Sequence, residues 1–142
     1  MIHLHATPSL VHNSRVNGNG RNFFLGRIRA FGCAARGLGV LVATQHAAWV
    51  HLAAAIAACL LGWYVGLTRA EWLWMVAAIA MMWLAESLNT ALEFLCDAVH
   101  PERHPLIRNA KDIGATAVLI TAIAAIVIGV LIFGPHLLPK LF

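Results

Sequence analysis

Charged residues are scarce in this chain of 142 residues, since Asp, Glu, Lys and Arg together make up only 11% of it. Hydrophobic residues make up 61%, and the mean hydropathy is +0.77. A soluble globule of this length needs far more polar side chains to cover its surface, so the composition excludes that class of protein. The chain is therefore predicted to be a membrane protein with a single embedded domain.

Paired cysteines and a secretion signal are also lacking. Cys33, Cys59 and Cys96 are odd in number and lack metal-ligand spacing, so they are predicted to be packing residues without a disulfide. The N-terminal segment has no apolar run beside a cleavage-like site and is not a signal peptide. We expect a flexible polar tail over residues 1–21, followed by a membrane-embedded domain over residues 22–142.

Long apolar runs are what the chain does have. Residues 47–67 contain His51 as their sole ionisable side chain, and residues 113–133 contain no charge. Each run is long enough to cross a bilayer, and residues 72–99 provide a third span with an apolar first half. Residues 22–44 mix arginines with aromatic and aliphatic side chains, which predicts an amphipathic helix at the membrane interface. The expected fold class is all-α, with three transmembrane helices.

Positive charge is distributed unevenly around these spans. Only Arg69 and Lys140 fall on one side of the membrane, whereas the other Lys and Arg residues fall on the opposite side. The positive-inside rule then predicts a cytoplasmic N-terminus, a cytoplasmic loop over residues 98–112 and an external C-terminus. Anionic headgroups account for the net charge of +4, so no nucleic-acid partner is expected.

Three of the six acidic residues lie within one span, at Glu86, Glu93 and Asp97. At 100° per residue they fall within roughly 20° of a common direction, and Asn89 and Thr90 flank them. A charged side chain at membrane depth is costly, so three in register with an amide indicate a functional site more than a polar packing seam.

The predicted cytoplasmic loop adds complementary chemistry, because His104, Arg108, Lys111 and Asp112 follow the acidic helix closely. Carboxylate oxygens suit Mg²⁺, which takes one or two protein carboxylates together with substrate phosphates. Phosphoryl transfer needs charge neutralisation, positioning and a group that orients or deprotonates the attacking hydroxyl. The residue types are sufficient for that reaction, although a cation pathway would need the same acids.

Two sequence blocks resemble the prokaryotic diacylglycerol kinase family, which includes the undecaprenol kinases. They are ESLNTALEFLCD at residues 86–97 and AKDIGATAVL at residues 110–119. Both are similar to the family patterns E-x-x-N-S/T-A-I/L-E-x-x-x-D and A-K-D-x-G/A-S/A-x-A-V. Looser similarity extends from about Phe23 through the rest of the chain.

The resemblance implies a homotrimer of three-helix protomers, each with an N-terminal surface helix and active sites shared between neighbouring subunits. By position, Glu86 would be the catalytic base acting on a lipid hydroxyl, and Glu93 would bind Mg²⁺. The residues implied at the nucleotide and its polar network are Asn89, Asp97, Glu102, His104, Lys111 and Asp112. Arg27 and Arg29 are candidates for phosphate contact or for membrane anchoring.

The chain departs from the family near the start of its first span. Gln45 stands where the family commonly has a metal-binding Glu, and Ala47 stands where it has Asn, whereas His51 matches a frequent family His. Gln45 could still offer a neutral carbonyl oxygen to the metal, which would weaken metal binding.

The predicted function is ATP- and Mg²⁺-dependent phosphorylation of a lipid alcohol, diacylglycerol or undecaprenol, at the cytoplasmic face of a bacterial inner membrane. The rival interpretations are a weakened or inactive kinase relative and an oligomeric cation-binding membrane protein. A cation pathway needs acids throughout the membrane depth, and the first and third spans offer only His51 and hydroxyl groups. The distribution of acids therefore favours the kinase.

Overall fold

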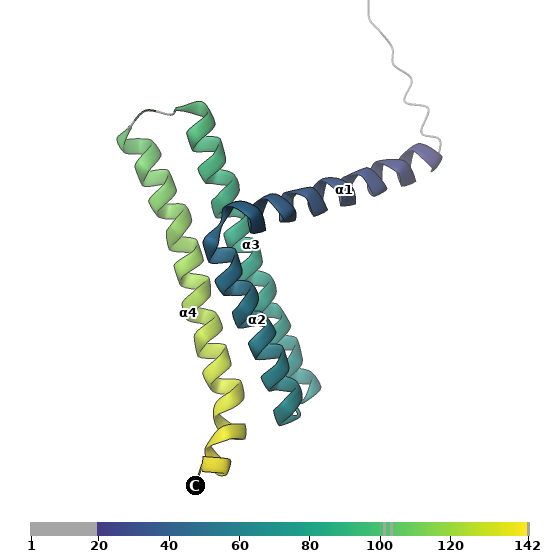
Figure 1. Ribbon diagram of the computed structural model, residues 1–142, viewed down its shortest axis with the longest axis vertical. Coiled ribbons are helices and arrows are strands. Elements are labelled where there is room, and N and C mark those ends of the chain that lie inside the picture. Colours follow the sequence, from purple (N-terminus) through teal and green to yellow (C-terminus); the bar gives the residue numbers. More distant parts are fainter. Residues whose placement is uncertain (1–19, 101, 103, 142) are drawn as a thin grey trace, which may run out of the picture. The chain divides into compact units, whose positions relative to one another are not determined.

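The described part of the chain is entirely helical in its regular structure. The computed structural model describes residues 20–100, 102 and 104–141, and it contains helices α1 (Gly20–Thr44), α2 (His46–Val65), α3 (Arg69–Val99) and α4 (Pro105–Leu141). The chain divides into two compact units, Met1–Ala35 and Arg36–Phe142. The second unit holds α2, α3 and α4, which run beside one another in Figure 1.

Helix α1 confirms the helix expected before the first span, and it begins two residues earlier than predicted. Its described apolar side chains in the first unit, such as Ile28 and Phe31, are exposed. The predicted tail lies outside the described residues except for Gly20 and Arg21, which are helical. The interfacial location of α1 and the division of the chain at residue 22 stay predictions.

A tight turn joins α2 to α3, and the sequence explains it locally. Gly66 ends α2 in the left-handed conformation with φ of 77°, which glycine adopts without a steric penalty. Thr68 then caps α3: its hydroxyl accepts from the Glu71 N–H, and the Thr68 N–H donates to Glu71 Oε2 at 2.8 Å. The two residues therefore form a capping box at the start of α3.

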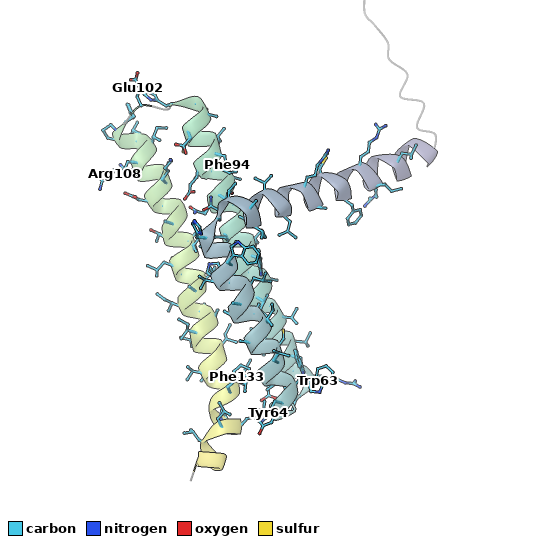
Figure 2. The ribbon with its side chains drawn as sticks, viewed as in Figure 1. Trp63, Tyr64, Phe94, Glu102, Arg108 and Phe133 are labelled. Carbon is cyan, nitrogen blue, oxygen red and sulfur yellow. The ribbon has the colours of Figure 1, made fainter. Side chains whose placement is uncertain are left out.

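Helices α3 and α4 pack most extensively, as antiparallel neighbours. Contacts along the pair include Thr121 with Met82 midway and Lys111 with Asp97 near the connecting loop. At the other end Leu67, Met75 and Ile132 form a small buried core. Figure 2 shows the two ends, with Phe133 far from Glu102 and Arg108. A polar site near the loop is thus separated from the apolar core.

Helix lengths agree with a membrane-spanning bundle. Helices α2, α3 and α4 are each long and apolar enough to cross a bilayer, which confirms the three predicted spans. At 1.5 Å per residue, the 31 residues of α3 extend about 46 Å, whereas the hydrocarbon core is about 30 Å thick. One end of α3 must therefore extend past the hydrocarbon. Aromatic residues at the Trp72 end favour the membrane interface, so we expect the acidic end to be the one that extends.

Candidate functional site

Helix α3 carries the three acids on one face because it is continuous from Arg69 to Val99. Their exposure increases towards the loop. Glu86 is 3% exposed, Glu93 is half-buried, and the side chain of Asp97 is 64% exposed. The polar stripe therefore leads from a buried carboxylate to one in contact with solvent, as a site that takes a water-soluble ligand at one end requires.

Glu86 lies close to the side chain of His51 on α2. The Oε2 atom of Glu86 lies 3.7 Å from Nε2 of His51, and only 20% of the His51 side chain is exposed. This separation is too long for a direct hydrogen bond. Nε2 of His51 is nevertheless buried and has no hydrogen-bond partner. The most buried acid of the chain and an unsatisfied imidazole therefore face the same small volume.

Asn89 connects the acidic face to α4. Its Nδ2 atom donates to Oε1 of Glu93 at 3.0 Å, which fixes the carboxylate of Glu93 one helical turn away. Its Oδ1 atom points at Gly114 of α4, where an added Cβ would lie 2.5 Å from it and 3.1 Å from a methyl group of Leu92. Glycine at residue 114 therefore lets the two helices approach closely enough to hold Asn89.

Replacing Gly114 by alanine is expected to lower the melting temperature of the protein in detergent. The added methyl group collides with Asn89 and Leu92, and overpacking of this kind costs about 1–3 kcal/mol. That cost exceeds the gain of about 1 kcal/mol from removing a helical glycine. Gly134→Ala is the matched control on α4, since nothing lies within 4 Å of its added Cβ. Equal melting temperatures for the two variants would contradict the close approach at residue 114.

Lys111 joins the start of α4 to the end of α3. Its Nζ atom lies 2.5 Å from Oδ1 of Asp97. Asp112 follows Lys111 in the sequence, and its Oδ2 atom lies 3.7 Å from Nε of Arg108, one turn earlier on α4. These pairs are largely exposed, so each contributes little to stability. They leave the charged groups accessible to a ligand that carries its own charges.

A pocket of about 830 Å³ lies at the loop end of α3 and α4. Glu102 and Arg108 mark this end of the helices in Figure 2. The pocket combines cations, acids and imidazoles, and its volume is within the range of small-molecule sites. Its polar lining consists of Asp97, His100, Glu102, His104, Arg108, Asn109, Lys111 and Asp112.

Six residues selected from the sequence are thus brought to one pocket, namely Asp97, Glu102, His104, Arg108, Lys111 and Asp112. Glu86, Asn89 and Glu93 lie further along the same face of α3. Gln45 is half-buried between α1 and α2, in an extended conformation, and its side chain makes no capping hydrogen bond. Its role as a metal ligand stays a prediction.

Mg²⁺ prefers oxygen ligands, and the acidic face of α3 provides carboxylates. Within residues 20–100, 102 and 104–141, no three His, Cys, Asp or Glu side chains gather as a protein-only metal site. Mg²⁺ does not need such a cage, because it retains waters and binds one or two carboxylates together with substrate phosphates. Glu93 lies one helical turn before Asp97, which lines the loop pocket together with Lys111, and this arrangement is compatible with that mode of binding.

Three residues of the site were not assigned to it from the sequence. The signal for His51 is that it is the one histidine of residues 47–67, because a titratable side chain at membrane depth is costly. His100 lies at the end of α3, where its ring is 5.4 Å from the ring of His104, and Asn109 lines the loop pocket. No pattern in the sequence marks either of these two residues.

Fold and site together define a multi-pass helical membrane protein with an acidic face that opens into a charged pocket at one end. The profile of the prokaryotic diacylglycerol kinase family matches residues 32–133. The undecaprenol kinase of Bacillus subtilis is 38% identical over 109 residues, which cover 77% of this chain and 89% of that protein.

Two diacylglycerol kinases are also similar. The enzyme of Synechocystis sp. is 32% identical over 110 residues, covering 77% of this chain and 63% of that protein. The enzyme of Escherichia coli is 28% identical over 100 residues, covering 70% of each chain. The chain belongs to the prokaryotic diacylglycerol kinase family, a family of lipid kinases. The family resemblance seen in the two sequence blocks is therefore confirmed.

Proposed function

We propose that this protein is an ATP- and Mg²⁺-dependent kinase of a membrane lipid alcohol, acting at the cytoplasmic face of a bacterial inner membrane. The acceptor is undecaprenol or diacylglycerol. The greater identity and coverage with an undecaprenol kinase make undecaprenol the first acceptor to test. The observation that carries the proposal is the single face of α3, which places the buried Glu86 between apolar spans and a charged pocket open to solvent.

Glu86 is the general base in this proposal. It takes the proton of the lipid hydroxyl while that oxygen forms a bond to the γ-phosphorus of ATP. The bond from phosphorus to the β,γ-bridging oxygen breaks, and ADP leaves with the electron pair. A general base must lie within hydrogen-bond reach of the hydroxyl. A buried carboxylate at the lipid side of the site meets that need for an amphipathic acceptor.

The loop pocket is the proposed nucleotide site. Lys111 binds phosphate oxygens as a point charge. Before the nucleotide binds, the exposed carboxylate of Asp97 holds the ammonium group of Lys111 in place. Asp112, Glu102 and His104 complete the polar lining around the nucleotide. Glu93, oriented by Asn89, would hold Mg²⁺, with Gln45 as a second, neutral ligand. A metal ion bound there would supply positive charge close to the phosphates.

A homotrimer with sites completed by neighbouring subunits is part of the proposal. Four buried polar atoms of the described residues have no hydrogen-bond partner: His51 Nε2, Asn89 Oδ1, Thr90 Oγ1 and His100 Nδ1. Each unsatisfied buried group costs about 1–3 kcal/mol, so partners are expected from substrate, water or another subunit. All four atoms lie on the acidic face of α3 or close to it. A site shared between subunits would supply hydrogen-bond partners at this place.

The direct test is a panel of lipid alcohols incubated with the purified protein, Mg²⁺ and γ-labelled ATP, with the products separated by thin-layer chromatography. We expect labelled phosphate on undecaprenol, on diacylglycerol or on both. Absence of label from every lipid would contradict the kinase and favour an inactive relative. Ion flux and nucleotide binding measured on the same reconstituted sample separate that outcome from a cation-binding membrane protein.

A further inference from the structure

We propose that His51 is the second hydrogen-bonding partner of the acceptor hydroxyl, and that it positions this hydroxyl against Glu86. The inference rests on the proposed function, because it assumes that a lipid alcohol is the acceptor. It adds a residue of α2 to the acids of α3 and the charged residues of the loop pocket.

The distance between the two side chains is the first argument. The 3.7 Å between His51 Nε2 and Glu86 Oε2 exceeds a hydrogen bond. A single oxygen atom can nevertheless lie about 2.8 Å from both atoms. A hydroxyl group in that position would donate its proton to the carboxylate and accept a hydrogen bond from the imidazole N–H. Its remaining lone pair stays available to attack phosphorus.

Burial is the second argument. Glu86 is 3% exposed, and Nε2 of His51 is buried without a hydrogen-bond partner. An unsatisfied buried donor or acceptor in a native protein requires an explanation, and a partner that arrives with the substrate provides one. An apolar side chain at residue 51 would avoid that cost, and most other positions of α2 carry one.

The surroundings of His51 give the third argument. The ring lines a pocket of about 300 Å³ between α2, α3 and α4, whose other lining residues are apolar and include Met82, Trp83 and Ile126. Met82 lies one helical turn before Glu86. The His51 and Glu86 pair therefore stands where a polar face meets an apolar hollow. A lipid alcohol has the same profile, with one hydroxyl at the end of a hydrocarbon chain.

The test compares His51→Ala with His51→Gln in steady-state lipid phosphorylation. Loss of one hydrogen bond at the acceptor should lower kcat/KM for the lipid by about tenfold to a hundredfold in His51→Ala. The KM for MgATP should stay within twofold of the wild type, because the nucleotide pocket does not include residue 51. The amide nitrogen of glutamine reaches the position of Nε2, so His51→Gln should recover most of the lost activity.

Cys59→Ala is the matched control on α2, since Cys59 is exposed and lines neither pocket. Wild-type lipid kinetics in His51→Ala would overturn the inference. A rise in KM for MgATP as large as the loss for the lipid, together with a lowered melting temperature, would indicate a structural role and would also overturn it. Failure of His51→Gln to restore activity would do the same. A wild-type protein that phosphorylates no lipid would instead refute the proposed function, and this inference with it.

Discussion

Replacing Glu86 by glutamine is expected to lower lipid phosphorylation by about 10²- to 10⁴-fold, the contribution typical of a general base. The amide has the shape of the carboxylate and fits the same buried position, but it cannot take the proton of the acceptor hydroxyl. The fold should survive because the substitution removes a charge from a side chain that is 3% exposed. The measurement is the initial rate at saturating lipid and MgATP.

Glu71→Gln is the matched control for this experiment, because it makes the same change on the same helix at the opposite end. Glu71 caps α3 and lies 2.9 Å from His136, so its replacement should affect stability and leave turnover unchanged. A fully active Glu86→Gln protein would remove Glu86 from the role of base. Equal losses of activity in both variants would indicate a general loss of structure.

Replacing Glu93 by glutamine is expected to raise the Mg²⁺ concentration needed for half-maximal activity by about tenfold to a hundredfold. Changes around metal ligands commonly have effects of that size. The carbonyl group of the new amide can still accept the hydrogen bond from Asn89, so only the charge is lost at this position. The measurement is a Mg²⁺ titration of lipid phosphorylation at fixed ATP, started from protein treated with a chelator.

Gln45→Glu provides the opposite change, since it introduces a carboxylate where the family commonly has one. If Gln45 contacts the metal, this variant should need less Mg²⁺ than the wild type. An unchanged Mg²⁺ requirement in Glu93→Gln would exclude Glu93 as a ligand. An unchanged requirement in Gln45→Glu would place residue 45 outside the metal site.

The main features of the fold could be predicted from the sequence because they depend on local properties. Apolar runs longer than the bilayer requires identify α2, α3 and α4. Thr68 and Glu71 identify the start of α3 because both halves of a capping box lie within four residues. Proline favours the first turn of a helix, and α4 begins at Pro105.

Hydropathy alone does not give the full extent of α4. Hydropathy predicted a span over residues 113–133, whereas the helix covers Pro105–Leu141. The apolar run marks only the part suited to hydrocarbon, and a helix can continue through polar residues such as Lys111 and Asp112. The polar turns at the start of α4 matter most here, because they carry the side chains of the loop pocket.

The acidic face of α3 was predictable from helical periodicity alone, since three acids share one direction whenever the segment is helical. The contacts between helices could not be predicted from periodicity. The approach of His51 to Glu86 depends on how α2 is rotated against α3, and the approach of Asn89 to Gly114 depends on the spacing of α3 and α4. Neither rotation nor spacing follows from the period of a single helix.

The location of the site at the end of the bundle is the central claim of this account, and a sidedness measurement tests it most directly. The protein is reconstituted into sealed vesicles that contain its lipid acceptor. Vesicles in which the loop between α3 and α4 lies outside are separated from vesicles in which it lies inside. γ-Labelled MgATP is then added to the external solution. We predict labelled lipid only where that loop faces the added nucleotide, with labelling of the other vesicles after permeabilisation. Equal labelling of sealed vesicles in both orientations, or labelling only where the loop is enclosed, would contradict the account.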